Sequence, residues 1–290
     1  MPSSSLPLHS EHQRTYHENK FVYPVLSRRS KGISIGINLN PDKICNFDCI
    51  YCQVDRREES ETRFVGFEQL IAELDHMLKF VISGEIYKDP KFVSVPQDLR
   101  RINDIAFSGD GEPTTYRNFD QIVKAVADLK QKHHADQVKM VLITNASMFH
   151  RKSTQDALNI LDENQGEIWA KLDAGTESYF KTIDRTKIRF SQVLENIALV
   201  AKQRPIVIQS LFMLVNQRPP EEAEIDAYCQ RLNEIVNSGG QIKLVQVYTI
   251  ARRTAEDYVA PLSSEQVDQI ARKVEENTNL NTDVFYGNAD

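Results

Sequence analysis

Short apolar segments alternate with longer segments of helical periodicity along most of this chain, from residue 33 to residue 286. Between the apolar segments, apolar residues recur at spacings of three and four, as in 67–81 and 122–129, which is typical of amphipathic helices. The alternation favours parallel β/α units over β-sandwiches and helical bundles. The expected strands are 33–39, 102–108, 139–144, 167–172, 206–213 and 242–250, and further helices are expected at 153–162, 191–203, 219–237 and 263–276.

The organisation of the chain is simple. With 290 residues it is long enough to bury one large core, and it has no internal repeat and no long Gly/Pro linker. We therefore predict a disordered polar arm over 1–20 and a single domain over 21–290. The segment 84–101 contains two prolines and has no helical period, which indicates an insertion at the rim of the domain, of the kind that forms a lid.

Composition restricts the class of protein. Hydrophobic residues make up 41% of the chain, charged residues 26%, and the mean hydropathy is -0.44. No uncharged apolar run approaches the roughly 18 residues of a membrane span, and the polar start lacks the apolar region of a secretory signal. These features predict a cytoplasmic protein without membrane association.

The charge balance weighs against nucleic acid as a partner. A net charge of -6 has the wrong sign for a surface dominated by contacts to phosphates, so nucleic acid is possible but not favoured. A local basic patch that binds an anionic substrate remains an alternative, as does a solvated surface. The basic pairs that suggest it are Arg28 with Arg29, Arg56 with Arg57, and Arg252 with Arg253.

Three of the four cysteines lie within eight consecutive residues. Cys45, Cys49 and Cys52 form a C-x3-C-x2-C motif, whereas Cys229 lies far downstream in a predicted helix, where it is expected to be buried. Clustered thiols in a cytoplasmic chain indicate a metal centre or catalysis rather than disulfides. A structural zinc site would need a fourth, distant ligand. An iron–sulfur cubane held by three thiolates instead keeps one iron open for another ligand.

The segment CNFDCIYC resembles the signature of the radical S-adenosylmethionine (radical SAM) superfamily, in which an aromatic residue, here Tyr51, precedes the last cysteine. The resemblance implies a [4Fe–4S] cluster on Cys45, Cys49 and Cys52, with S-adenosylmethionine bound at the open iron. In that family one electron cleaves the cofactor to a 5'-deoxyadenosyl radical, which abstracts hydrogen from a substrate. Four cysteines are too few for a second cluster, so an external one-electron reductant, flavodoxin- or ferredoxin-like, is implied. Tyr51 is expected to contact adenine, to pack in the core, or both.

The resemblance covers about residues 30–255 and implies a partial (β/α)6 TIM-like barrel, whose active site lies at the C-terminal ends of the strands. The segment SGDGEPT is similar to the family's Gly-Gly-Glu-Pro turn, which receives the methionine amino group of the cofactor. Asp110, Gly111 and Glu112 are therefore expected at the cofactor, with Gly109 and Gly111 letting the backbone approach a ligand closely. Asp110 departs from the commoner pattern, and which of the three residues contacts the methionine moiety is left open.

Polar residues also lie at the ends of the next predicted strands. Thr144 and Asn145 match the family's Thr-Asn turn. Lys171 and Asp173 are two apart and share one face of a strand. The resemblance implies that they meet the ribose or carboxylate of the cofactor, and the alternative is an ion pair in the interior. Gln209 is expected to line the cofactor or substrate.

Longer segments narrow the resemblance to one branch of the superfamily. The segments that carry it are SRRSKGISIGINLNPDKICNFDCIYCQVDR, FSGDGEPT and KLDAGT, which look most like a bacterial branch related to wyosine-type tRNA-modifying proteins. We predict a radical SAM enzyme of unidentified substrate. The alternatives are a tRNA-base-modifying enzyme, an iron–sulfur electron carrier, and a zinc-binding module without catalysis. No residue identifies the catalytic contact to the substrate, the oligomeric state, or whether S-adenosylmethionine is consumed or regenerated.

Overall fold

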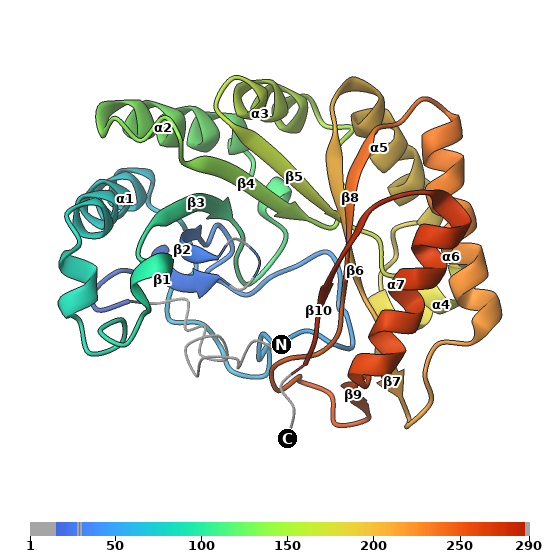
Figure 1. Ribbon diagram of the computed structural model, residues 1–290. Helices are drawn as coiled ribbons and strands as arrows, with labels where there is room; N and C mark the ends of the chain where they lie inside the picture. The colour runs from blue at the N-terminus through green and yellow to red at the C-terminus, as the bar shows by residue number, and fades with distance from the viewer. Residues whose placement is uncertain (1–15, 28, 30, 288–290) are drawn as a thin grey trace. The chain divides into compact units, whose positions relative to one another are not determined.

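The structure is a computed structural model that describes residues 16–27, 29 and 31–287. The chain forms two compact units, each built from several segments (Figure 1). The first unit contains the chain up to Cys45 together with Glu58–Ile143 and Arg151–Glu167. The second contains Asn46–Arg57, Thr144–His150 and the chain from Ile168 onward. The single domain predicted over 21–290 stays a prediction.

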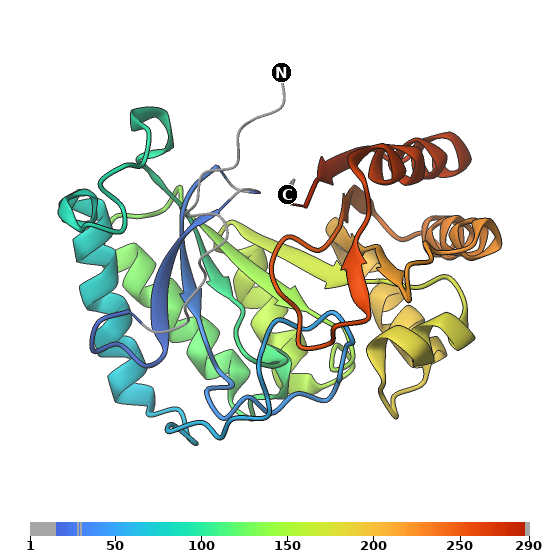
Figure 2. The ribbon, with the colours of Figure 1, turned by 90° about the horizontal axis from the view of Figure 1, so that it is seen from below.

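The first unit is a sheet covered by helices. Its strand order is β1, β2, β3, β4, with β1 antiparallel to β2 and the others parallel. Three helices cover one face of the sheet (Figures 1 and 2), and Phe107 packs edge-to-face on Phe119 beneath them, with ring centroids 5.5 Å apart. The elements are β1 (Val22–Ser27), β2 (Gly32–Ile37), α1 (Phe67–Ile82), β3 (Ile102–Phe107), α2 (Phe119–Lys132), β4 (Lys139–Thr144) and α3 (Lys152–Asp162).

The start of the described chain is fastened to this unit. The buried carboxylate of Glu73 in α1 accepts hydrogen bonds from the backbone N–H groups of Lys20, Phe21 and Val22. Tyr16 is buried and its hydroxyl donates to Asp89 at 2.6 Å. Residues 1–15 of the predicted polar arm lie outside the described residues, and of its last five residues Tyr16 is buried whereas His17, Glu18 and Lys20 are exposed.

The segment 84–101 consists of two short 3-10 helices, η2 (Glu85–Lys88) and η3 (Gln97–Leu99), joined by turns. Ile86 and Phe92 are fully buried, so the segment is anchored by apolar side chains. Its role as a rim insertion or lid stays a prediction.

The second unit holds a parallel sheet in the order β5, β6, β8, β10, and a two-stranded antiparallel sheet of β7 and β9. Figure 2 shows α6 and α7 side by side in this unit. The elements are β5 (Gly166–Lys171), α4 (Glu177–Asp184), α5 (Phe190–Gln203), β6 (Ile206–Leu211), β7 (Met213–Val215), α6 (Glu222–Asn237), β8 (Ile242–Tyr248), β9 (Val259–Pro261), α7 (Ser264–Thr278) and β10 (Thr282–Phe285).

The predicted alternation of strands and helices is confirmed. Each of the six predicted strands and six predicted helices is present, with ends that differ by a few residues. The pattern missed the short or peripheral strands β1, β7, β9 and β10, and it missed α4. An eight-residue helix spans little more than two turns and gives almost no periodic signal. Within the described part of the chain, no helix has the length and apolar character needed to cross a membrane.

Candidate active site

The cysteines lie on a long loop between β2 and α1. Residues 38–66, all of which the structure describes, form neither helix nor strand. Cys45 belongs to the first unit, and Cys49 and Cys52 belong to the second. All three are half-buried, and none of the four cysteines, each within the described chain, is in a disulfide. Cys229 is buried in α6, as predicted.

The backbone of this loop is hydrogen-bonded to the C-terminal end of α4. The Asp48 N–H donates to the Asp184 carbonyl at 3.1 Å, and the Ile50 N–H donates to the Ile183 carbonyl at 2.8 Å. The last carbonyls of a helix have no partner within the helix and need donors from elsewhere. The loop supplies these donors, so α4 and the cysteine loop hold each other in place.

Residues beside α4 extend this attachment. Arg185 has left-handed backbone with φ 42°, and its Nε donates to the Asp48 carbonyl at 2.7 Å. The Thr186 hydroxyl donates to the Asn46 carbonyl at 2.9 Å. The Asn145 amide donates to Asn46 Oδ1 at 2.8 Å. Asn145, predicted as part of a cofactor-binding turn, therefore holds the residue that follows the first cysteine.

Acidic side chains lie directly beneath the loop. Cys49 Sγ donates to Asp184 Oδ1 at 3.2 Å, and the Tyr51 hydroxyl donates to Asp173 Oδ2 at 2.5 Å. Burial, together with the charge of Asp184, raises the pKa of the Cys49 thiol well above its ordinary value. Burial and the charge of Asp173 likewise raise the pKa of Tyr51. Burial, and then the charge of Asp173, raises the pKa of Asp184.

Lys171, the last residue of β5, forms an ion pair with Asp173, which lies two residues further on. Lys171 Nζ lies 3.0 Å from Asp173 Oδ2 and donates to the Tyr248 hydroxyl at 3.0 Å, and it sits 4.7 Å from the centre of the Tyr51 ring. The other carboxylate oxygen of Asp173 accepts the Leu211 N–H at 2.7 Å. Burial lowers the pKa of Lys171, but the charge of Asp173 and the interactions with Tyr248 and Cys49 together outweigh burial, so the pKa is raised and the ammonium form is held. The strand ends at Lys171, so Asp173 lies in the turn that follows it; the two side chains are paired, and their role at the cofactor stays a prediction.

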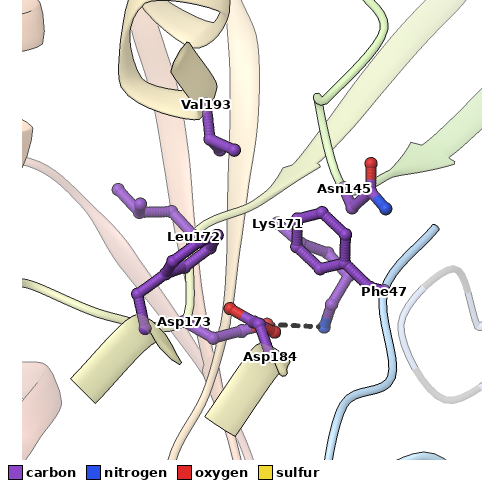
Figure 3. A pocket seen from close by; sticks show the side chains of 8 residues that line it. Phe47, Asn145, Lys171, Leu172, Asp173, Asp184 and Val193 are labelled. Carbon is purple, nitrogen blue, oxygen red and sulfur yellow. Dashed lines mark ion pairs between the residues drawn. The ribbon is translucent and has the colours of Figure 1, made fainter. Parts of the chain in front are cut away.

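Figure 3 shows these residues around a small cavity, with the Lys171–Asp173 ion pair as a dashed line. The cavity measures about 10 Å³, which is close to the minimum that one water molecule needs. The side chains around it therefore contact one another rather than line an open pocket. They are Phe47, Asn145, Lys171, Leu172, Asp173, Phe180, Asp184 and Val193.

Two other predicted residues are held in the interior of the second unit. The Thr144 hydroxyl accepts the Ala146 N–H at 3.0 Å and so closes the turn after β4. Gln209 is 1% exposed, and its amide donates to Gln246 at the neighbouring position of β8, at 2.8 Å. This pairing explains how two amide side chains are tolerated in apolar strands.

The predicted methionine-binding turn lies in the first unit, at the end of β3. Asp110 Oδ2 accepts Asn38 Nδ2 at 2.6 Å, and the Asp110 N–H donates to Asn38 Oδ1 at 3.1 Å. Glu112 is buried, and its carboxylate accepts the Thr114 N–H at 3.1 Å, capping the short helix η4 (Pro113–Thr115). Both carboxylates thus have structural partners in addition to any role at a cofactor.

The structure shows a steric reason for the two glycines. A Cβ on Gly109 would lie 2.2 Å from Asn38 Oδ1, and one on Gly111 would lie 2.2 Å from the Ile44 carbonyl. These protein atoms occupy the space that was expected to serve a ligand. The glycines are therefore required because the turn packs against residues 38–44, which lead into the first cysteine. The side chain of Asn40 lies beside Gly111, and its buried Oδ1 has no hydrogen-bond partner among the described residues.

Sequence reasoning missed two residues of the site. Asp184 lies on α4, the helix without a periodic signal, and only tertiary structure brings it to Cys49. Arg56 was considered only as half of a basic pair, but its Nη1 donates to Cys52 Sγ at 2.8 Å. Its position four residues after the last cysteine could have indicated the contact. Among the described residues, no three His, Cys, Asp or Glu side chains are arranged as a site for a single metal ion.

The sequence was compared with models of known protein families. A family model for the radical SAM superfamily matches residues 39–228, about two thirds of the chain, including all three clustered cysteines. The chain belongs to the radical SAM superfamily. Members of this superfamily use a [4Fe–4S] cluster and S-adenosylmethionine and generally require an external reductant. The prediction of the family and of its two cofactors is confirmed.

Curated relatives are longer proteins. The chain is 26% identical over 268 residues to a protein named GTPase Obg from Brachyspira hyodysenteriae, a match that covers 90% of this chain and 34% of that protein. It is 27% identical over 178 residues to a UPF0026 protein from Helicobacter pylori, covering 60% of this chain and 49% of the relative. The chain thus spans between a third and a half of these relatives. Its sequence has no G-x4-G-K-[ST] phosphate-binding motif.

Solved structures show the same fold. The structure of TYW1 with a lysine–pyruvate adduct bound matches with a TM-score of 0.50 at 15% identity, covering 91% of this chain and 78% of that one. Streptococcus suis SuiB bound to S-adenosylmethionine matches with a TM-score of 0.53 at 13% identity, covering 89% and 49%. These likenesses confirm the predicted fold class, the partial (β/α)6 TIM-like barrel of radical SAM proteins.

The residues present fit the family's two cofactors. Three half-buried thiols on one loop are suitable ligands for an iron–sulfur cluster. The buried, unpartnered Asn40 Oδ1 lies next to the Gly111 turn and can accept a hydrogen bond from a bound group.

Proposed function

We propose that this chain holds a [4Fe–4S] cluster on Cys45, Cys49 and Cys52 and cleaves S-adenosylmethionine reductively, so that hydrogen is abstracted from a substrate still to be identified. When bound, the cluster supplies the electron that breaks the carbon–sulfur bond of the cofactor. The observation that carries the proposal is the match of the radical SAM family to a stretch in which three thiols follow β2 on one loop.

The chain's own residues prepare the ligand loop. Four hydrogen bonds from or to the α4 end fix the loop backbone at Asn46, Asp48 and Ile50. A loop held in this way presents Cys49 and Cys52 without the entropy cost of ordering them at cluster binding. Phe47 packs edge-to-face on Phe180 of α4, with ring centroids 5.7 Å apart, and so adds an apolar contact between the loop and the helix.

Two groups of residues are proposed to bind S-adenosylmethionine. In the second unit, Lys171 and Asp173 supply a cation and a carboxylate beside the Tyr51 ring. In the first unit, the turn of Asp110, Gly111 and Glu112 supplies acceptors for the methionine ammonium. The ordered hydrogen bonds of both groups keep their charges oriented before the cofactor arrives.

Electron paramagnetic resonance tests the proposal. Anaerobically reconstituted, dithionite-reduced protein is measured with and without S-adenosylmethionine, and the same sample is assayed for 5'-deoxyadenosine. We expect a cluster signal that changes with the cofactor, cleavage product, and loss of both in Cys45→Ala, Cys49→Ala and Cys52→Ala. Cys229→Ala is the matched control and should behave as the wild type, because Cys229 is buried in α6.

The alternatives predict different results in the same experiment. An electron carrier would show a cluster signal that S-adenosylmethionine does not alter, and a zinc-binding module would contain zinc and no labile sulfide. Either result would overturn the proposed function.

For the reductant and the substrate we propose only the chemical class. A flavodoxin- or ferredoxin-like protein is proposed as the reductant, because the four cysteines do not suffice for a second cysteine-bound cluster. A small or peptide substrate is favoured over tRNA by the net charge of -6. Steep salt dependence of tRNA binding, measured by filter retention, would instead favour the tRNA-modifying alternative.

A further inference from the structure

One of the proposed cluster ligands has a cation in direct contact with its sulfur. Arg56 Nη1 donates to Cys52 Sγ at 2.8 Å, and Arg56 is half-buried. The backbone on the other side of Cys52 is also held, since the Ala255 N–H donates to the Cys52 carbonyl at 3.0 Å. The sulfur and the guanidinium therefore meet in a fixed part of the second unit.

The neighbouring arginine is placed differently. Arg57 is exposed, and its guanidinium pairs with Asp55 through two contacts, Nε to Oδ1 at 3.1 Å and Nη2 to Oδ2 at 3.2 Å. The two arginines carry the same charge one residue apart; the guanidinium of Arg56 donates to a cysteine sulfur, whereas that of Arg57 pairs with the Asp55 carboxylate. Arg57 therefore serves as a control for the effect of a positive charge near the cysteine loop.

We propose that Arg56 raises the reduction potential of the iron–sulfur cluster through its hydrogen bond to Cys52. The inference rests on the proposed function, in which Cys52 is a cluster ligand. Adding an electron increases the negative charge on the ligand sulfurs, so a cationic donor stabilises the reduced cluster more than the oxidised one. Hydrogen bonds to cluster sulfurs are among the features that set such potentials.

Arginine suits this role because its charge does not titrate. The guanidinium stays protonated throughout the working pH range, so the contribution of Arg56 to the potential is independent of pH. A cluster that is easier to reduce accepts an electron from a weaker external donor. Arg56 is thus a positioning and tuning residue that acts through Cys52 rather than a catalytic residue.

A redox titration followed by electron paramagnetic resonance tests the inference. The reconstituted wild type, Arg56→Gln, Arg56→Lys and Arg57→Gln are compared without S-adenosylmethionine, after iron and labile sulfide have been measured in each. At the wild-type midpoint we expect the ratio of reduced to oxidised cluster to fall about tenfold in Arg56→Gln, which for one electron is a shift of about 59 mV. Arg56→Lys should show a smaller fall, and Arg57→Gln should stay within about twofold of the wild type.

Three outcomes decide the matter. A fully loaded Arg56→Gln protein with the wild-type ratio overturns the inference and leaves the proposed function intact. Equal shifts in Arg56→Gln and Arg57→Gln also overturn it, because charge alone would then explain the effect. If Arg56→Gln takes up less iron, the Arg56→Lys variant provides the test. An unchanged ratio of reduced to oxidised cluster in Arg56→Lys would then count against the inference. Failure of the proposed function is separately visible, since Cys52→Ala would then retain the cluster.

Discussion

The Tyr51 hydroxyl donates a hydrogen bond to Asp173 Oδ2 at 2.5 Å, and so joins the residue before the last clustered cysteine to the turn that follows β5. The same carboxylate oxygen lies 3.0 Å from Lys171 Nζ, and the other accepts the Leu211 N–H. Asp173 is thus a buried anion with three donors, one of which comes from the cysteine loop. This contact couples the position of the ligand loop to the packing of the parallel sheet.

Replacing Tyr51 by Phe tests that coupling. The substitution keeps the ring and removes the hydroxyl, which leaves a buried carboxylate with one donor fewer. We expect the free energy of unfolding to fall by about 1–3 kcal/mol. Urea denaturation followed by circular dichroism measures the change. An unchanged stability would show that the 2.5 Å contact is not made in solution.

Replacing Lys171 by Met removes the cation that faces Asp173. An unpaired buried charge is costly, and we expect a loss of about 3 kcal/mol in the free energy of unfolding. Because the cost arises from the uncompensated carboxylate, Asp173→Asn in the same chain should recover part of it. A double-mutant cycle of Lys171→Met and Asp173→Asn measures the coupling, and additive effects would contradict an ion pair between them.

Replacing Gly111 by Ala tests the close packing of its turn, which we propose binds the methionine moiety, against residues 38–44. The added Cβ would lie 2.2 Å from the Ile44 carbonyl, which is backbone and can move only with the chain that carries Cys45. We expect a loss of about 1–3 kcal/mol in stability, together with reduced iron content after reconstitution. Gly66→Ala is the control, because its nearest neighbour would lie 3.6 Å away, and it should change iron content little.

The pKa of Asp75 leads to a prediction of how the stability of the protein depends on pH. Its carboxylate is held by Lys132, Lys79 and His133 at 2.7, 2.6 and 2.9 Å, and hydrogen bonds from these three side chains lower the pKa of Asp75 below its ordinary value. A lowered pKa in the folded state stabilises the protein above the unfolded pKa of about 3.9, and this contribution is lost as the pH falls toward the folded pKa.

Asp75→Asn should therefore cost about 1 kcal/mol at pH 7, a modest value because the network lies at the surface. The difference between the variant and the wild type should be complete above about pH 5 and should shrink below about pH 4. Urea denaturation across this range measures it. A difference that grows on acidification would have the wrong sign for a carboxylate stabilised by cations.

The local sequence pattern predicted the strands and helices, and it showed the cysteine motif and the polar residues at the strand ends. Hydrophobic periodicity reports which face of a segment is buried, so the six strands and six helices could be read from neighbouring residues. Lys171 and Asp173 were placed on one face by the two-residue period of a strand, and the structure pairs them at 3.0 Å. The motif of Cys45, Cys49 and Cys52, taken together with the turns that follow the predicted strands, indicated the family, because ligands of one cluster can lie close together in sequence.

The contacts that position these residues are visible only in the tertiary structure. Asp184 reaches Cys49 from 135 residues away, on a helix too short to give a periodic signal. Gly111 is required by the Ile44 carbonyl, an atom that no local pattern places next to it. Contacts between segments distant in sequence depend on how the β/α units pack, and a one-dimensional pattern contains no such distances. The sequence by itself therefore indicated the family and the fold class and predicted the three cysteines as cluster ligands, and packing determined which residues contact those cysteines.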